Sequence, residues 1–525
     1  MTANRTERRR LLPRWRPWQT ALLLREMSPA HPRTDPARFA PALDGALQQW
    51  RRKPTATRGA EVLAAALAHS GHRDEVREVA LRVRDGMATS HVRRLADEVL
   101  NSEDVDRPKF DWETTGEPFQ DGASARLIAE LRSRTRSHPR NALTWLDLAR
   151  AYFAEGLDQQ ARRCIEIALA LDPDNRFIVR CAVRFLVHEG DEKRAQRVVL
   201  AAAGSDDDPW LLSVIVALSA STRRNSLRVG EDVLNSGSFH PWHVGELGAA
   251  LATREDDHGK SRSAKRLMRQ ALVDPTENVL AHAEWASHLV AGDVPAHEMP
   301  RAPFEALARR SARRLEWVAA ASHAWQWHLD EPFSSLAAGT GSCYAIYAGN
   351  YDQAERMATV GLKANPDDAT LLNNRAFARA CQWNLRDALE DFSAINFRAA
   401  DPDSQACALA TAGFIAYRAG AHDLGRKGYE RAIRHFQGRK QKDSAARAMI
   451  NLASEEVRAE TPLAESAVAR AELLVEAARS AEVDELWNRL SKRVALGTAE
   501  PLTIEGKQVI ADGVATRLPL IDEGL

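Results

Sequence analysis

The sequence has few cysteines, and none of them form a recognisable pair. Five occur in 525 residues, and no two have Cys-x-x-Cys spacing. This odd and scattered set argues against a disulfide framework and against a zinc knuckle. Most of the five lie in apolar helical patterns, where a free cysteine behaves as a small core residue. They are Cys164, Cys181, Cys343, Cys381 and Cys407.

Long apolar runs are also missing. One of the longest nearly apolar stretches, Leu211 to Leu218, is far shorter than the ~20 residues that a membrane helix needs. Near the N-terminus, several arginines are followed only by the short apolar run Ala21 to Leu24. A signal peptide requires a longer apolar region. We therefore expect a cytoplasmic chain without a membrane span.

A net charge of either sign is absent as well. Lys plus Arg and Asp plus Glu both number 72. This balance argues against a polycation that coats nucleic acid, although local basic patches remain open. The apolar fraction of 44% is sufficient for a packed core, so disorder is not expected for most of the chain. The abundance of Arg over Lys, together with the abundance of Ala, is typical of proteins from GC-rich bacterial genomes.

The stretch from Ala142 to Asn175 contains two helical faces separated by a glycine. The first face carries Trp145, Leu148 and Tyr152, Gly156 follows, and the second carries Ala161, Ile165 and Ala168 before Asp172-Pro173. This order resembles the 34-residue tetratricopeptide pattern W-x2-L-G-x2-Y, A-x3-F, P. Ala149 replaces the glycine of the first helix, and Ile165 replaces the aromatic residue of the second. Small residues let two helices approach closely, and glycine permits the tight turn between them.

The same register recurs along the chain. Gly190 follows Gly156 by 34 residues, and Ala388 follows Ala354 by the same interval. The resemblance is strong over residues 142–208 and 335–434 and weak between residues 210 and 332. It implies an all-α, tetratricopeptide-like helical-hairpin solenoid with a right-handed superhelical path, in a bacterial multi-repeat protein.

Composition shifts divide the chain into eight expected segments. They are an Arg/Pro-rich flexible leader (1–35), N-terminal degenerate helical repeats (36–102), an acidic linker (103–121), tetratricopeptide repeats (122–209), degenerate helical repeats (210–332), further tetratricopeptide repeats (333–440), closing helices (441–496) and a C-terminal tail (497–525). The tail alternates apolar and polar residues around Glu505-Gly506, which favours a short β-like hairpin or an extended strand.

Motifs for catalysis, metal binding or cofactor binding are weak. Gly259-Lys260-Ser261 lacks the earlier glycine and the preceding strand of a phosphate-binding loop. Gly339-Thr340-Gly341-Ser342 stands within a predicted helix, where close packing explains its glycines. Histidines gather between His282 and His328, but none has His-Glu-x-x-His spacing. We expect no catalytic residue, no metal and no cofactor.

The resemblance places partner-binding residues on the first helix of each unit, where the concave groove of such solenoids lies. The implied groove residues are Asp147, Arg150, Arg180, Arg184, Asn374, Phe377, Phe414 and Tyr417. The three arginines form a basic patch, and guanidinium groups suit carboxylates or phosphates. Ordinary solvated arginines are the equally weighted alternative.

Three functions compete at this stage. The first is a non-enzymatic scaffold or regulatory adaptor that binds a protein or peptide segment in the concave groove, with an acidic segment as the candidate ligand of the arginines. The second is a nucleic-acid-binding protein that uses the Arg-rich leader and the groove arginines. The third is an enzyme with an unrecognised site. The balanced net charge favours the first, and the partner's identity and the oligomeric state stay open.

Overall fold

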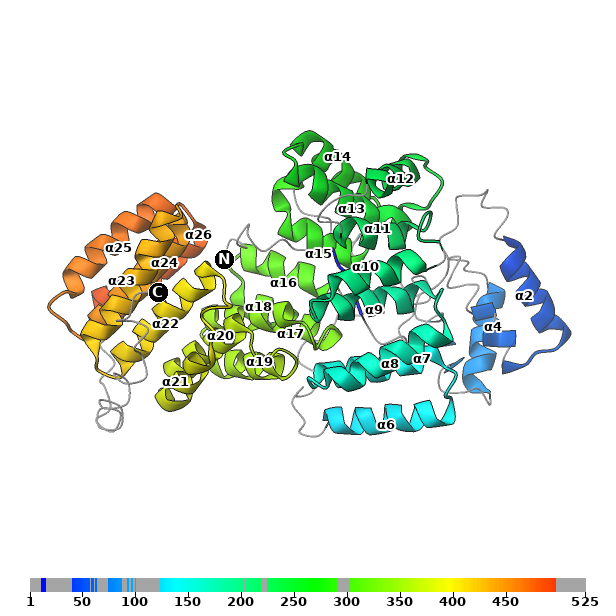
Figure 1. Cartoon of the computed structure of the whole chain (residues 1–525), viewed down its shortest axis with the longest axis horizontal. Coiled ribbons are helices and arrows are strands. Elements are labelled where there is room, and N and C mark those ends of the chain that lie inside the picture. Colours follow the sequence, from blue (N-terminus) through cyan, green and yellow to red (C-terminus); the bar gives the residue numbers. More distant parts are fainter. Residues whose placement is uncertain are drawn as a thin grey trace. The chain divides into compact units, whose positions relative to one another are not determined.

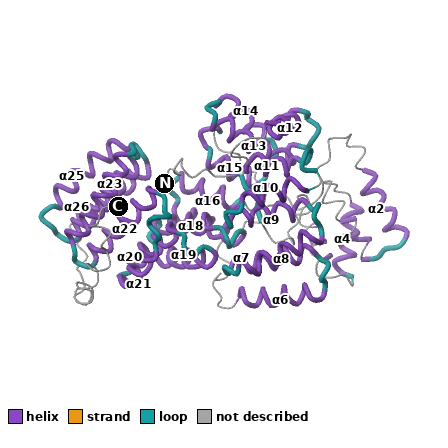
Figure 2. The backbone as a smooth tube through the Cα atoms, viewed as in Figure 1, coloured by secondary structure: helices purple, strands orange, loops and turns teal. Residues whose placement is uncertain are grey.

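The described part of the chain consists of helices, the loops that join them and a short non-helical segment at residues 11–15. The computed structural model describes residues 11–15, most of 40–63 and of 74–100, 123–202, 204–218, 224–290 and 303–496. Figure 2 shows helices joined by loops in these ranges, and they contain no strand. The all-α prediction is confirmed. The expected acidic linker (103–121) and the β-like tail (497–525) lie outside the described residues.

The chain forms two compact units, which we call the N-terminal unit (Arg8–Ala306) and the C-terminal unit (Leu307–Leu525). The boundary falls inside α16 (Phe304–Arg313). Figure 1 labels the helices. Those of the N-terminal unit are α2 (Ala40–Arg52), α4 (Asp74–Asp85), α6 (Ala123–Ser137), α7 (Ala142–Ala154), α8 (Asp158–Leu171), α9 (Arg176–His188), α10 (Glu192–Ala201), α11 (Pro209–Leu218), α12 (Arg224–Asn235), α13 (Pro241–Asp257), α14 (Ser261–Ala271), α15 (Glu277–Trp285) and the short η2 (Ser287–Leu289).

The C-terminal unit continues the alternation of first and second helices. Its helices are α17 (Trp317–Asp330), α18 (Ser335–Tyr347), α19 (Tyr351–Ala364), α20 (Ala369–Cys381), α21 (Leu385–Ala394), α22 (Pro402–Arg418), α23 (His422–Gly438), α24 (Lys442–Arg458), α25 (Ala464–Ala478) and α26 (Ala481–Leu496). The segment 441–496, where closing helices were expected, contains α24, α25 and α26.

Capping residues and turn glycines in the sequence pattern determine where the helices α7 to α10 begin and end. Asn141 and Asn175 cap α7 and α9, since each side chain accepts hydrogen bonds from two backbone amides of its helix. Gly156 and Gly190 stand in the turns after these helices with φ of 70° and 77°. This left-handed conformation favours glycine. The 34-residue spacing therefore marks equivalent turns of successive hairpins.

Sequential helices pack as pairs, and the pairs stack. α7 packs on α8, α9 on α10 and α13 on α14, and the first helices α7, α9, α11, α13 and α15 also contact one another in succession. Ala149 and Ala161 are fully buried, as expected of residues at helix crossings. The fully buried aromatic residue of α7 is Phe153, however, and Trp145 and Tyr152 are only partly buried. The arrangement is a tetratricopeptide-like stack of helix pairs, and it extends through the weakly matching region as α11 to α14.

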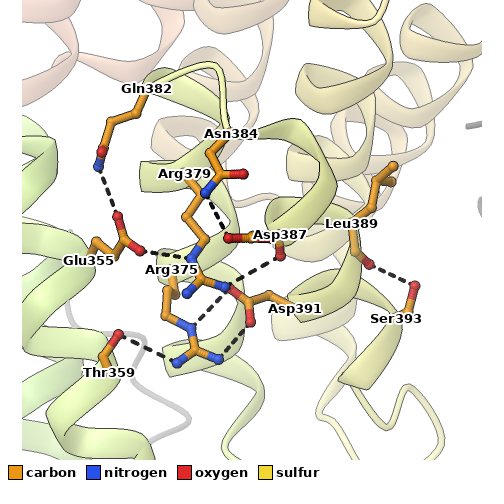
Figure 3. A network of polar contacts seen from close by, with 10 residues as sticks. All are labelled: Glu355, Thr359, Arg375, Arg379, Gln382, Asn384, Asp387, Leu389, Asp391 and Ser393. Atoms are coloured by element: carbon orange, nitrogen blue, oxygen red, sulfur yellow. Dashed lines mark hydrogen bonds and ion pairs between the residues drawn. The ribbon is translucent and has the colours of Figure 1, made fainter. Parts of the chain in front are cut away.

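A polar network ties α19, α20 and α21 together (Figure 3). Arg375 donates two hydrogen bonds to the Asp391 carboxylate, at 2.9 and 2.6 Å. Arg379 donates to Asp391 at 2.9 Å and to Glu355 on α19 at 2.9 Å. Asp391 is buried, while both guanidinium groups are partly exposed. One carboxylate thus fixes two arginines of the preceding helix.

Replacing Asp391 with asparagine is expected to lower the free energy of unfolding by about 1–2 kcal/mol. An amide keeps the shape but loses charge-assisted hydrogen bonds, whose contribution is reduced here because water reaches both guanidinium groups. Urea denaturation followed by circular dichroism measures the change. Asp387→Asn is the matched control, because its carboxylate accepts from Asn384 in an exposed contact. A full-length variant as stable as the parent protein would contradict the structural role of Asp391.

Candidate functional site

The first helices of the N-terminal unit, α7, α9, α11, α13 and α15, contact one another in succession. We call the surface that these helices form together the first-helix face. Capping residues fix the start of its later members. His240 caps α13, and Thr276 caps α15 through its hydroxyl. Several polar side chains of these helices are buried among apolar neighbours, at positions where apolar residues are usual.

A buried ion pair occupies the centre of the first-helix face. Arg180 on α9 donates to the Glu246 carboxylate on α13 at 2.6 Å, and both side chains are less than 5% exposed. Glu246 also accepts from the Asn278 side-chain amide on α15 at 3.2 Å. Burial of a charge without a partner is very unfavourable, so these three residues depend on one another.

A second ion pair and a tryptophan extend this charged layer. Arg176 donates to Asp208 at 2.9 Å, and its side chain is only 4% exposed. The guanidinium carbons of Arg176 and Arg180 lie 5.3 and 4.6 Å from the centre of the Trp210 ring. An arginine over a tryptophan face is attracted by the ring quadrupole. Arg176 and Arg180 are therefore held by acids and by an aromatic ring from this same unit.

Residues Leu11–Trp15 lie on the first-helix face as a short non-helical segment (dark blue beside α15 in Figure 1). The side chain of Trp15 is fully buried, and its ring centre is 6.0 Å from that of Phe153 on α7. Leu11 is buried too. These five residues belong to the segment predicted to be a flexible leader (1–35), and within them Leu11, Pro13 and Trp15 are buried. The rest of residues 1–35 lies outside the described residues.

Two side chains of the face bind the backbone of this segment. Arg150 Nε donates to the carbonyl oxygen of Trp15 at 3.2 Å, and Asn278 Nδ2 donates to that of Leu12 at 2.9 Å. A third contact is selective, since Arg14 forms an ion pair with the buried carboxylate of Glu305 at the start of α16. The first-helix face thus binds the backbone of the segment and buries one indole, while Glu305 on α16 supplies an acid for one basic side chain.

The four groove residues predicted for the N-terminal unit, Asp147, Arg150, Arg180 and Arg184, are on α7 and α9, and the three arginines are not solvated cations. Asp147, Arg150 and Arg180 are buried, and Arg184 is partly buried. Arg150 binds the Trp15 carbonyl, and Arg180 binds Glu246. The prediction missed the two residues that complete the arrangement, Glu246 and Asn278. An acid inside the apolar run Val244 to Ala252 was the signal for the first.

The predicted residues of the C-terminal unit have three different environments. Asn374 is buried, and its amide donates to the Gly339 carbonyl at 3.1 Å and to the Ser342 hydroxyl at 3.0 Å, so it fastens α20 to α18. Phe377 and Phe414 stack, with ring centres 4.7 Å apart. The two aromatic rings therefore join α20 to α22.

Tyr417 does not belong to a groove. It is fully buried, its ring stacks on His422 with centres 5.5 Å apart, and it packs against Tyr429 of α23. Its position on α22 faces the second helix of the same hairpin, where three glycines bring the two backbones together. The prediction of Tyr417 as a partner-binding residue is corrected to a core role.

The last helix, α26, covers part of the C-terminal unit. The Arg447 guanidinium on α24 donates to Glu482 at 2.8 Å, and Arg489 donates to the Tyr347 carbonyl at 2.9 Å. Trp317 donates to Glu485 at 2.7 Å. Burial disfavours the charged form of Glu482, but interactions that favour it, among them the charge of the adjacent Arg447 and a hydrogen bond from Tyr347, lower the pKa of that carboxyl to about 2. Contacts with α17, α18 and α24 make α26 an integral closing element.

The weak chemical motifs have structural roles. Gly259-Lys260-Ser261 lies at the turn between α13 and α14, so a helix rather than a strand precedes it. Lys260 pairs with Glu255. Gly341 lies in α18, where a Cβ atom would meet Met357 at 1.9 Å. Among the residues that the structure describes, no group of three histidine, cysteine or acidic side chains could hold a metal. Within the same ranges, no helix has both the length and the apolar character required to cross a membrane.

Comparisons with known proteins give structural likeness only. Three solved structures align over most of the chain: a chain of the APC/C hetero-tetramer Cut9-Hcn1 (13% identity, 86% of this chain and 93% of that chain, TM-score 0.32), human IFIT1 solved as a dimer with PPP-AAAA (13%, 90% and 97%, 0.30) and yeast Tom70 (12%, 88% and 97%, 0.30). No protein-family model and no curated protein matches the sequence. At these TM-scores the alignments carry no functional argument.

Proposed function

We propose that this tetratricopeptide-type chain is a non-enzymatic protein-interaction scaffold or adaptor, and that its first-helix face binds an extended segment of a protein. The observation that supports the proposal is the position of the chain's own residues 11–15. The face holds this segment through the backbone, at Arg150 and Asn278, and through two side chains, Arg14 and Trp15. Side-chain donors that reach backbone carbonyls suit any extended peptide.

The charge of the face favours a basic rather than an acidic ligand. We expected Arg150, Arg180 and Arg184 to recognise carboxylates. Arg180 is already neutralised by Glu246, while the buried Glu305 receives an arginine from the docked segment. A nucleic acid would need unpaired cations for its phosphates. The paired arginines of α9 do not supply them, so a peptide with an arginine is the better candidate.

A labelled peptide of residues 9–17 is expected to bind full-length Trp15→Ala protein, because this substitution weakens the docked segment and leaves the face intact. Fluorescence anisotropy measures the affinity. Replacing Arg150 with methionine in the same protein should weaken binding by about 10-fold, since it removes a charge-assisted hydrogen bond worth ~1.4 kcal/mol or more.

The matched control is Arg162→Met on α8, a second helix, where the arginine is 39% exposed and pairs with Glu189. Its effect on peptide affinity should be negligible. If the peptide fails to bind Trp15→Ala protein at concentrations up to about 1 mM, the first-helix face is not a peptide-binding site. Equal losses for Arg150→Met and Arg162→Met would place the binding surface elsewhere.

A further inference from the structure

We infer that residues 11–15 act as a built-in competitor, and that the partner is a protein segment with the same chemistry: an apolar residue, an extended stretch, and then an arginine followed directly by a tryptophan or another large aromatic residue. This inference rests on the proposed function and names both the ligand class and its regulation. The docked segment reads Leu11-Leu12-Pro13-Arg14-Trp15. Each of its contacts identifies one feature that a competing ligand must have.

The apolar ends of the motif follow from burial. Leu11 is 2% exposed and Trp15 is fully buried against the first-helix face. A tryptophan buries a large apolar area with only two rotatable side-chain bonds, so it binds with a small loss of entropy. The approach of its ring to Phe153, with centres 6.0 Å apart, adds an aromatic contact. The partner residue at this position must therefore be large and aromatic.

The basic residue of the motif follows from Glu305. Its side chain is only 3% exposed, and Arg14 is its partner within the segment. Removal of that arginine without replacement takes a cation away from a nearly buried carboxylate, which is unfavourable. A ligand with its own cation at this position restores the ion pair with Glu305, so such a ligand is favoured. A segment with an acid at this position would be rejected by like charge.

The extended conformation follows from the two backbone contacts. Arg150 and Asn278 donate to the carbonyl oxygens of Trp15 and Leu12, three residues apart. A helical ligand would use those carbonyl oxygens for its own hydrogen bonds. Pro13, which is buried between them, has no amide hydrogen and favours an extended backbone. These contacts select a segment without helical structure.

Covalent attachment makes the docked segment an effective competitor. A tethered ligand faces its site at an effective concentration of about a millimolar, so a free peptide of equal intrinsic affinity is disfavoured. The contacts that hold the segment include two backbone hydrogen bonds, one ion pair and three buried apolar side chains, and a competing ligand can offer each of them equally. A partner with the same motif and additional contacts to the N-terminal unit would displace residues 11–15.

The test compares one peptide with full-length proteins that differ only in the docked segment. The labelled peptide of residues 9–17 should bind Trp15→Ala protein at least 10-fold more tightly than the parent protein. Arg14→Glu, which places two acids together at Glu305, should give the same gain by an independent route. Trp383→Ala is the matched control, since Trp383 is an exposed tryptophan of the C-terminal unit. Its affinity for the peptide should equal that of the parent protein.

A second readout follows the segment itself. In hydrogen exchange, excess unlabelled peptide should increase the exchange of the backbone amides of residues 11–15 in the parent protein. A peptide in which the arginine is replaced by glutamate should not do so.

The outcomes separate the inference from the proposed function. Equal peptide affinities for parent and Trp15→Ala protein, with binding in both, would overturn the built-in competitor and leave the scaffold function standing. No binding to any of these proteins would overturn the proposed function itself. A doubling of molecular mass with concentration that disappears in Trp15→Ala protein would show exchange of the segment between copies, and would overturn its role as an intramolecular ligand.

Discussion

Glu246→Ala is expected to lower the free energy of unfolding of the N-terminal unit by about 3–5 kcal/mol, the largest stability effect of any single polar substitution that we predict. Glu246 is 3% exposed, and it accepts from both Arg180 and Asn278. Its removal takes away the carboxylate that pairs with the buried Arg180 guanidinium, and loss of one partner of a buried ion pair typically costs this much. Hydrogen exchange of α9 and α13 localises the effect to this unit.

The double variant Arg180→Met with Glu246→Leu distinguishes an unpaired charge from a packing defect. When apolar side chains of similar volume replace both charges, roughly half or more of the lost stability should return. Glu255→Ala is the control for charge alone, because Glu255 pairs with the exposed Lys260 and should change stability by less than ~1 kcal/mol. If Glu246→Ala were as mild as Glu255→Ala, the buried pair would not organise the first-helix face.

Glu246 also links stability to binding. Its second hydrogen bond holds Asn278, the residue that binds the Leu12 carbonyl. Orientation of a binding group by a neighbour that does not touch the ligand is common in functional sites. The alanine variant should therefore bind the peptide of residues 9–17 more weakly even under conditions where the N-terminal unit stays folded.

The hairpin stack could be predicted from the sequence because its signals are local. Gly156 and Gly190 occur where a left-handed turn is needed, and Asn141 and Asn175 occur where helix amides need an acceptor. Gly349 and Gly420 stand in equivalent left-handed turns, and Asp368 and Asp401 cap later first helices in the same way. Because these signals recur in several hairpins, the spacing of 34 residues is visible in the sequence alone. Even the weakly matching region between residues 210 and 332 retained enough periodicity to show its helices.

The contacts of the first-helix face could not be predicted in the same way. The hydrogen bond from Arg150 to Trp15 joins residues 135 positions apart, and that from Asn278 to Leu12 spans 266. Trp15 lies in an Arg/Pro-rich segment without helical periodicity, so the spacing of apolar residues could not predict its burial. Arg180 was more tractable, because a charge between Val179 and Cys181 in an apolar helix requires a buried acid.

Tyr417 shows a limit of a different kind. Its place in the first helix suggested a groove residue, but a tetratricopeptide pattern fixes only the mean register of a helix. In α22 and α23, Gly413, Gly425 and Gly428 allow the backbones to come unusually close. The tyrosine is then enclosed by the second helix of its own hairpin. Helix separation depends on these glycines, and a pattern of single residues does not report it.

Gly413→Leu is expected to lower the free energy of unfolding of the C-terminal unit by about 3 kcal/mol or more, because it adds a large side chain where helix backbones touch. A Cβ atom on Gly413 would lie 2.6 Å from the Gly425 carbonyl oxygen and 3.1 Å from the Tyr429 backbone nitrogen. Neither atom is the end of a flexible side chain, so relief requires movement of the whole helix. Urea denaturation measures the loss.

The matched control lies in the same hairpin. A Cβ atom on Gly438, at the end of α23, would meet nothing within 4 Å, so Gly438→Leu should be neutral or slightly stabilising through its better helix propensity. Separation of α22 from α23 should also disturb the stacked rings of Phe377 and Phe414, because Phe414 is on the displaced helix. A loss of near-ultraviolet circular dichroism in Gly413→Leu alone would report this. Equal stability of the two variants would mean that the close approach of α22 and α23 is absent from the folded protein in solution.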